Sequence, residues 1–233
     1  MKAVILAAGE GTRMRPLTLR APKPLLTVAG KPLIEHLVSS LPAEITEIIM
    51  VVGYLADKIK DYCGHKFLGR RIIYVSQKDN KAGTFNALEC CEHYLSPGRF
   101  LLLCGDDLHS PKSLRACVDS KELSVLLARV ENPERFGVAL VDAKGVIKEI
   151  EEKPKQPKSN LVNCGPAVLN KKILDYPPPR SHTGEYYVTD SINLMIKDGY
   201  KFYGVEADWW IPIGYPEDLK KAEEFLKNLK ISE

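Results

Sequence analysis

Two glycines, a threonine and two basic residues near the N-terminus carry chemistry suited to a polyphosphate. Gly9 and Gly11 follow an apolar run, and Thr12 and Arg13 come directly after them. Glycines let backbone N–H groups approach phosphate oxygens closely, and arginine adds charge and a fork of donors. Lys23, held between two prolines, is a further cation. The spacing predicts an anion-binding loop directly after a buried strand.

Two familiar phosphate-binding templates do not fit this loop. The dinucleotide fingerprint G-x-G-x-x-G needs a third glycine where the chain has Met14. The P-loop pattern fails as well, because no Gly-Lys-Ser/Thr follows Gly9. A basic loop with Arg13, Arg15 and Lys23 remains. The plainer alternative is a tight turn with solvated arginines, but solvation explains a lysine between two prolines poorly.

The elements that must position this loop alternate between strand and helix. Buried strands are expected at 3–7, 47–53, 71–75 and 100–104, and helices at 31–41, 55–62 and 83–95. This alternation is typical of a parallel, doubly wound sheet that binds nucleotides at the carboxyl ends of its strands. Asp106 follows the fourth strand, so we expect its carboxylate at the edge that holds the loop. A cap carboxylate is the alternative for Asp106 and the preferred interpretation for Asp107.

The second half of the chain has a different pattern. Residues 136–141 and 146–150 flank Asp-Ala-Lys-Gly, which predicts a β-hairpin. Residues 161–169 read as a strand broken by Asn-Cys-Gly-Pro, and the polar stretch 151–160 reads as a solvated loop. Further along, the stretch that starts at Thr183 is expected to enter a helix that ends at Lys197, and Pro216 to begin the last helix.

These patterns predict one α/β unit over residues 1–233. We expect a Rossmann-like, doubly wound mixed sheet, with a nucleotide-binding half at about 1–130 and a smaller, more antiparallel half at about 131–233. No hexapeptide repeat is present, so no C-terminal β-helix is expected.

Composition limits the class of partner. The 233-residue chain is 45% hydrophobic and 27% charged, with a formal net charge of +3. So small a charge does not indicate nucleic acid, and no apolar run approaches the roughly 18 to 20 residues of a membrane span. The six cysteines form no CxxC pair, so reduced core thiols are expected rather than a disulfide framework. We expect a cytoplasmic protein without nucleic-acid or membrane partners, and the sequence leaves a homo-oligomer open.

The N-terminal stretch also carries a family resemblance. Leu6-Ala-Ala-Gly-Glu-Gly-Thr-Arg-Met-Arg-Pro-Leu-Thr, with Pro22-Lys-Pro-Leu, resembles the signature of the sugar-1-phosphate nucleotidylyltransferases, or NDP-sugar pyrophosphorylases. The resemblance implies the nucleotide-diphospho-sugar transferase fold. It also implies a Mg²⁺-dependent reaction in which an NTP and a sugar 1-phosphate give an NDP-sugar and pyrophosphate.

The resemblance assigns nucleotide contacts to Leu6, Ala7, Ala8, Gly9, Gly11, Thr12, Arg13, Gln77, Gly83 and Thr84. Arg13 would bind the β- and γ-phosphates, and Lys23 would neutralise charge at the α-phosphate. Gln77, with the Gly83-Thr84 pair, fits the place where these proteins contact the base. Phe85 replaces the small residue usual there, so the base stays open.

The resemblance also places a metal and a sugar-phosphate site. Asp106 matches the aspartate that binds Mg²⁺, and the sugar-phosphate residues match Gly137, Glu152, Lys153, Asn163 and Gly165. Glu152 would bind sugar hydroxyls and Lys153 the phosphate. Taken alone, Glu152-Lys153 reads as a solvated charge pair. The chemistry is consistent, because a phosphate monoester is already an anion and needs cations more than a strong base.

One departure concerns the metal. The family usually carries an aspartate in a Trp-x-Asp-x-Gly segment, and Pro212 stands at that position here. Either Asp106 and the phosphates hold Mg²⁺ alone, Asp208 substitutes, or metal binding is impaired. Pro212 motivates one rival function, a catalytically inactive, nucleotide-sensing subunit. A second alternative with the same fold is a cytidylyltransferase for a phospho-alcohol, such as a phosphorylated choline or inositol.

Overall fold

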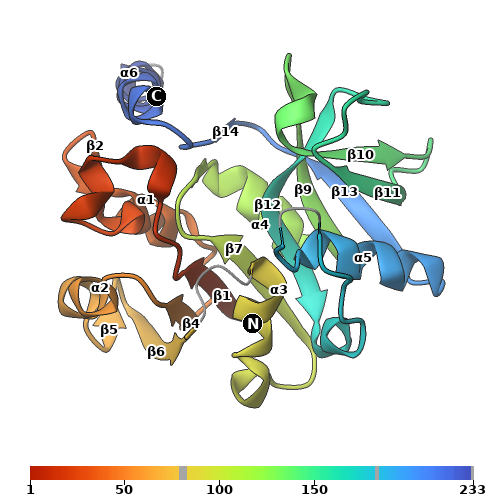
Figure 1. Cartoon of the computed structure of the whole chain (residues 1–233), viewed down its shortest axis with the longest axis horizontal. Helices are drawn as coiled ribbons and strands as arrows, with labels where there is room; N and C mark the ends of the chain where they lie inside the picture. Colours follow the sequence, from red (N-terminus) through yellow and green to blue (C-terminus); the bar gives the residue numbers. More distant parts are fainter. Residues whose placement is uncertain (79–82, 182–183, 232–233) are drawn as a thin grey trace.

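The computed structural model describes residues 1–78, 83–181 and 184–231, and one large sheet runs through both halves of the chain (Figure 1). Its strands are β1 (Lys2–Ala7), β4 (Glu47–Val52), β5 (Lys66–Phe67), β6 (Arg70–Ser76), β7 (Arg99–Cys104), β9 (Leu123–Arg129), β10 (Gly137–Val141), β11 (Ile147–Glu152), β12 (Leu161–Asn170) and β13 (Phe202–Glu206). In the described residues these ten strands follow the order β11-β10-β12-β7-β1-β4-β6-β5, with β9 paired to β12 and β13 to β9.

Helices cover both faces of the sheet. They are α1 (Leu33–Ser40), α2 (Ala56–Cys63), α3 (Thr84–Glu89), α4 (Pro111–Asp119), α5 (Val188–Lys197) and α6 (Pro216–Ile231). The side chains of β1 alternate between two clusters: Ala3 and Ile5 pack with α1, α2 and α4, whereas Val4 packs with α3 and α5. This alternation gives three layers, and it confirms the predicted doubly wound α/β class.

The first half contains the parallel part of the sheet, as predicted. β1 pairs in parallel with β4 and β7, and β4 pairs in parallel with β6. The predicted strands and α2 each lie within two residues of their expected bounds. Because these strands are parallel, the carboxyl ends of β1, β6 and β7 lie at one edge. The N-terminal loop and Asp106 follow two of these ends.

The second half continues the same sheet with antiparallel pairs. β10 and β11 form the predicted hairpin, and β12 pairs antiparallel with β7, β9 and β10. The register of β12 against β9 shifts between Asn163 and Ala167, where the predicted break falls. β9 and β13, which pair in parallel, were not predicted, and they extend the sheet beyond β12.

Three sequence-based boundaries were wrong. Residues 31–32 pair with 27–28 as β3 and β2, because Pro32 has an extended backbone and precedes α1 rather than opening it. The helix expected over 83–95 ends at Glu89 and is followed by a separate 3₁₀ turn, η4 (Glu92–Tyr94). Glu151 and Glu152 belong to β11 opposite β10 instead of a solvated loop. α5 ends at Lys197 as expected, and Thr183 lies outside the described residues.

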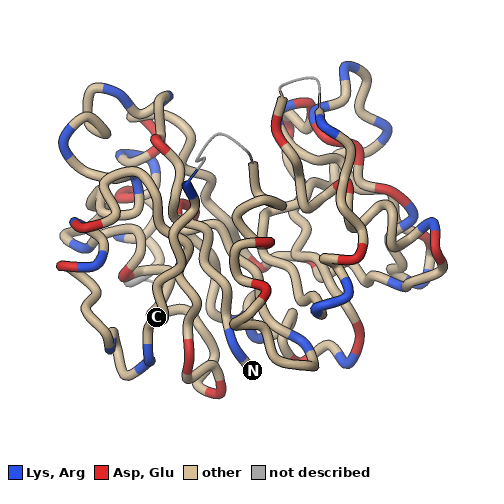
Figure 2. Tube along the Cα trace, turned by 60° about the horizontal axis from the view of Figure 1, so that its bottom comes forward, with Lys and Arg blue, Asp and Glu red and all other residues tan. Residues whose placement is uncertain are grey.

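Charged residues of both signs are distributed over the whole chain. Figure 2 shows basic and acidic positions interspersed over both halves. Among the described helices, none combines the length and the apolar composition needed to cross a membrane. All six cysteines carry free thiols, four of them buried, and burial raises the pKa of the Cys63 and Cys91 thiols to about 12.

Candidate functional site

A cleft of about 790 Å³ opens at the carboxyl edge of the sheet. Every residue predicted to contact the nucleotide lines it: residues 6–9 and 11–13, with Gln77, Gly83 and Thr84. Lys23, Asp106 and Lys153 line it as well. The strand ends of a parallel sheet have therefore gathered side chains that are far apart in sequence, as the fold class predicts.

The N-terminal loop is folded tightly onto the segment that carries Lys23. Gly11 has a left-handed φ of 60°, and a Cβ there would lie 3.0 Å from Thr18 Cγ2 and 3.2 Å from Lys23 Cβ. The Gly11 carbonyl accepts hydrogen bonds from Thr18 Oγ1 and the Met14 N–H, both at 2.9 Å. Met14 is buried in a small cluster beneath α6. Glycine is needed at position 11 because the loop and the lysine segment touch there.

Lys23 and Asp106 form the central ion pair of the cleft. Lys23 Nζ lies 2.6 Å from Asp106 Oδ2, and Lys23 is only 8% exposed. Burial disfavours the charged form, but Asp106 and Asp107 outweigh it and raise the pKa of Lys23 above its ordinary value. The lysine is therefore a fixed cation beside the end of β7.

Arg13 stands at the mouth of the cleft against an aromatic ring. Its guanidinium carbon lies 5.6 Å from the centroid of Tyr215, and that of Arg135 lies 5.5 Å from the same centroid. Among the described residues, neither arginine forms an ion pair with a carboxylate. Tyr215 thus connects a cation of the N-terminal loop with a cation of the second half, and both charges remain available to an anion.

The residues predicted for the sugar phosphate lie together beside the cleft. Gly137 pairs with Glu152, a Cβ on Gly137 would lie 3.1 Å from Glu152 Oε2, and the Gly165 N–H donates to Asn163 Oδ1 at 2.8 Å. Lys153 reaches the cleft, whereas the other four do not line it. Burial raises the pKa of Glu152, with Lys153 opposing the shift. Lys153 itself has a φ of 47°, and its N–H donates to the Phe136 carbonyl.

Helix α5 joins the two sides of the site. The Val188 N–H, at the start of α5, donates to Thr84 Oγ1 at 3.0 Å, and the Phe85 N–H donates to the Tyr186 carbonyl at 2.9 Å. In the middle of α5, the Asn193 amide bonds both the N–H and the carbonyl of Ile150, at 2.9 and 2.7 Å. Ile150 lies two residues before Glu152, so α5 links the nucleotide side to the sugar-phosphate side.

The three candidate carboxylates have different surroundings. Asp106 lines the cleft, but Asp107 accepts hydrogen bonds from Trp210 Nε1 and the Ile213 N–H, each at 3.0 Å. Asp107 thus caps the segment that contains Pro212, as the sequence favoured. Asp208 accepts from Ser110 Oγ at 2.9 Å and pairs with Lys112, at the start of α4. The structure does not bring Asp208 into the cleft with Asp106.

The donor set for Mg²⁺ is therefore small. In the described part of the chain, no group of three or more His, Cys, Asp or Glu side chains is placed to hold a metal. Mg²⁺ is commonly held by one or two carboxylates together with substrate phosphates. Asp106 fits that arrangement, because its hard oxygen ligands face the same cleft as the cationic loop.

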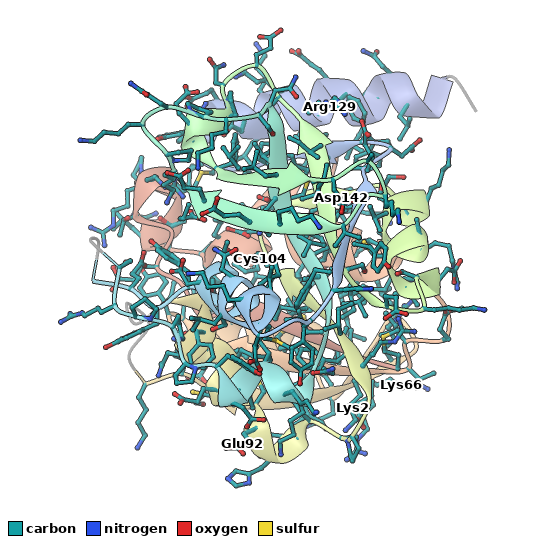
Figure 3. The ribbon with its side chains drawn as sticks, turned by 90° about the vertical axis from the view of Figure 1, so that its right-hand side faces the viewer. Lys2, Lys66, Glu92, Cys104, Arg129 and Asp142 are labelled. Atoms are coloured by element: carbon teal, nitrogen blue, oxygen red, sulfur yellow. The ribbon has the colours of Figure 1, made fainter. Side chains whose placement is uncertain are left out.

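Several residues that line the cleft were not predicted from the sequence as part of the site: Glu10, Met14, Pro24, Ala87, Cys104, Glu185, Tyr187 and Gly214. Cys104 ends β7 and lines the cleft, and Figure 3 shows it well away from Lys2, which begins β1, and from Glu92. Burial raises the pKa of its thiol, so the thiol stays protonated. Glu185 and Tyr187 come from the Glu-Tyr-Tyr run before α5, a cluster of polar and aromatic residues that was a usable signal.

Comparison with known proteins agrees with this geometry. A family model described as nucleotidyl transferase matches residues 2–228. The chain is 34% identical over 229 residues to the bifunctional protein GlmU of Methanocaldococcus jannaschii, covering 97% of this chain and 54% of that protein. It is 35% identical over 240 residues to the UTP–glucose-1-phosphate uridylyltransferase AglF of Haloferax volcanii, covering 97% of each.

A solved structure shows the same fold. A Bacillus anthracis protein, provisionally described as a glucose-1-phosphate thymidylyltransferase and crystallised with a sucrose, superposes with a TM-score of 0.87. The two sequences are 32% identical, and the match covers 98% of this chain and 96% of that one. The chain belongs to the nucleotidyl transferase family. It spans about half the length of the curated GlmU relatives that it matches.

Proposed function

We propose that this protein transfers a nucleotidyl group from an NTP to a sugar 1-phosphate, giving an NDP-sugar and pyrophosphate. The observation that carries the proposal is the Lys23–Asp106 pair, set in one cleft with Arg13 on one side and Lys153 on the other. Family membership and a near full-length likeness to AglF support it. We propose that the reaction takes place in the cytoplasm, because the proposed substrate is an NTP and the cysteines of the protein are free thiols.

The proposed chemistry needs charge and alignment more than a base. A phosphate oxygen of the sugar 1-phosphate attacks the α-phosphorus of the NTP, and the bond to the bridging oxygen of the β-phosphate breaks. Pyrophosphate leaves with the electron pair. Lys23 offsets the charge at the α-phosphate, Arg13 binds the departing pyrophosphate, and Lys153 holds the attacking phosphate. Glu152, next to Lys153, binds sugar hydroxyls.

We include Mg²⁺ in the proposal, with Asp106 as the protein ligand. The Asp106 carboxylate would hold the ion, which would supply positive charge against anion repulsion. Asp208 is not proposed as a ligand, because Ser110 and Lys112 already engage its carboxylate at α4. Chelation with EDTA is expected to abolish turnover, and added Mg²⁺ to restore it.

A substrate matrix tests the proposal. Pyrophosphate release is measured for ATP, GTP, CTP, UTP and dTTP, each paired with several sugar 1-phosphates. Glucose 1-phosphate is tested first, because AglF and the crystallised neighbour are named for it. Phosphorylated choline and inositol, paired with CTP, test the phospho-alcohol alternative. We expect release with a sugar 1-phosphate and its loss in Asp106→Asn. Silence in every pair would contradict the proposal.

One observation favours a second candidate, an inactive nucleotide-sensing subunit. Pro212 stands where the family carries its second metal aspartate, and Asp208 lies outside the cleft. That candidate predicts NTP binding in calorimetry without pyrophosphate release from any pair. Turnover that Asp106→Asn removes would exclude it.

A further inference from the structure

Two arginines from different halves of the chain share one aromatic ring at the mouth of the cleft. Arg13 belongs to the N-terminal loop, and Arg135 ends the short 3₁₀ turn η5 (Pro133–Arg135) just before β10. Their guanidinium carbons lie 5.6 and 5.5 Å from the centroid of the Tyr215 ring. Two like charges near one ring repel each other, and an anion bound by both would relieve that repulsion.

The shared ring is presented by an anchored turn. The Gly214 and Tyr215 N–H groups donate to Asp218 Oδ2 at 2.9 and 2.8 Å, and the Asp218 N–H donates to the Tyr215 carbonyl at 3.0 Å. Gly214 lines the cleft. Asp218, in the first turn of α6, therefore fixes the backbone that places the Tyr215 ring beside the cleft.

Arg135 also contacts a second ring. Its guanidinium carbon lies 6.0 Å from the centroid of Phe136, which packs edge-to-face on Trp210 with 5.1 Å between the ring centroids. Trp210 Nε1 in turn donates to Asp107 at the end of β7. Aromatic contacts thus hold Arg135 near the strand end that carries the proposed metal ligand.

The N–H donors of Arg13 and Arg135 are unused within the described chain. Neither guanidinium forms an ion pair or a side-chain hydrogen bond with another described residue, and Arg135 is exposed. Arg129 of β9 differs, because it pairs with Glu206 at 3.2 Å and donates to Asn160 at 3.1 Å. A guanidinium fork matches two oxygens of a phosphate, so two such forks suit a ligand with several phosphate oxygens.

We propose that Arg135 is a further substrate-binding residue, which binds the departing pyrophosphate together with Arg13. The bond that breaks leaves its electron pair on that group, so negative charge develops there as the reaction proceeds. The shared Tyr215 ring favours this assignment over the attacking phosphate, because the proposed cation for that phosphate, Lys153, contacts a different ring, Tyr187, at 5.8 Å.

This inference rests on the proposed function, because it takes pyrophosphate as the leaving group of that reaction. It goes beyond the proposed function by assigning a residue that was not predicted as part of the site. Arg135 does not line the cleft in this structure, so its contribution would come from the rim. Tyr215 is the positioning residue for both arginines.

Pyrophosphate binding to the full chain, measured by calorimetry at a fixed Mg²⁺ concentration and without an NTP, tests the inference apart from turnover. Arg135→Gln should weaken binding at least ~10-fold, the loss expected for a hydrogen bond to a charged group. Arg135→Lys keeps the charge but not the fork, and its affinity should lie between those of Arg135→Gln and the wild type. The affinity for glucose 1-phosphate should stay unchanged in both variants.

Two further variants separate this role from a general effect of charge. Arg129→Gln removes an arginine of the same half whose partners lie outside the cleft, and it should leave pyrophosphate binding unchanged. In a Tyr215→Leu protein, Arg135→Gln should weaken binding by less than ~3-fold, because the ring no longer holds the guanidinium and the two changes are coupled. Additive losses would overturn the role of Tyr215.

The remaining outcomes distinguish the inference from the proposed function. Unchanged pyrophosphate binding in Arg135→Gln, an equal loss in Arg129→Gln, or a loss confined to glucose 1-phosphate overturns the inference alone. Pyrophosphate binding that depends on Arg135, without pyrophosphate release from any substrate pair, supports the anion site and contradicts the proposed function. A wild-type protein that binds neither pyrophosphate nor any NTP overturns both.

Discussion

Lys23 Nζ lies 2.6 Å from Asp106 Oδ2, so the residue proposed to offset the α-phosphate and the residue proposed to hold Mg²⁺ neutralise each other. The two are 83 positions apart and come from the lysine segment and the end of β7. Asp106 raises the pKa of Lys23, which keeps the ammonium charged over the whole range in which the protein would work. Bound substrate and metal would offer each residue a new partner of the opposite charge.

Lys23→Met should remove a cation that acts on the reacting phosphate. Loss of one such group typically lowers kcat about 10²–10³-fold, and we expect a fall of that size in pyrophosphate release. Lys112→Met is the control, because Lys112 is exposed and pairs with Asp208 outside the cleft. An equal loss in both variants would show that the effect is not specific to the cleft.

Tyr215→Leu should weaken NTP binding by releasing two guanidinium groups. Each cation–π contact at an exposed site contributes about 0.5–1 kcal/mol, so the loss of both should raise KM for the NTP about 5- to 30-fold. Tyr215→Phe keeps the ring face and should behave like the wild type. The KM for the sugar phosphate reports on Lys153 instead and should change little. A larger effect on kcat than on KM would argue against this role.

Gly83→Ala should lower the free energy of unfolding by disrupting the contact between Gly83, on the nucleotide side of the cleft, and Tyr186, just before α5. The new Cβ would lie 2.5 Å from the Tyr186 carbonyl oxygen and 2.7 Å from the Tyr186 nitrogen, at a φ of 95°. Gly199→Ala is the matched control, with a φ of 92° and nothing within 4 Å of the new atom. Both variants carry backbone strain, and only Gly83→Ala adds overpacking of about 1–3 kcal/mol. Urea unfolding should resolve that difference, and equal losses would contradict it.

His109 should make the fold sensitive to acid. It is 1% exposed, and neither ring nitrogen has a hydrogen-bond partner among the described residues. Burial lowers its pKa to about 3, so between about pH 6.5 and pH 3 the unfolded chain binds a proton that the folded chain does not. The free energy of unfolding should fall by about 1.4 kcal/mol per pH unit below 6.5.

His109→Leu removes that proton-binding difference and an unsatisfied polar group. The difference in stability between variant and wild type should therefore grow as the pH falls from 7 to 5, as measured by denaturant unfolding at each pH. At pH 7 the variant should be at least as stable as the wild type, because a buried imidazole without partners is unfavourable. A pH-independent difference would show that His109 is not protonated on unfolding.

Much of this site could be predicted because strand ends are local signals. Gly9, Gly11 and Asp106 each follow an apolar run directly, so their common edge followed from the parallel arrangement of those runs. Lys23 could be assigned because a lysine between prolines is a poor candidate for a solvated side chain. The strands β9 and β13 were harder to predict, because a central strand and its partner depend on pairing that lies about 80 residues away in sequence.

The candidate metal carboxylates show more clearly what the local sequence could not predict. Asp208 is close in sequence to Pro212, which stands where the resemblance expects an aspartate. The Asp208 carboxylate instead accepts a hydrogen bond from Ser110 at the start of α4. The local sequence does not indicate that partner, because Ser110 lies 98 residues away from Asp208. The sequence indicated a cap for Asp107, but the bond to Trp210 Nε1 could be seen only in three dimensions.

Helix α5 touches both sides of the cleft, at Thr84 through its first residue and at Ile150 through Asn193. If one substrate orders its side, the helix is already held in place when the other arrives. The two ligands should then bind cooperatively, and linkage requires the enhancement to be reciprocal: an NTP must tighten the sugar phosphate by the same factor that the sugar phosphate tightens the NTP.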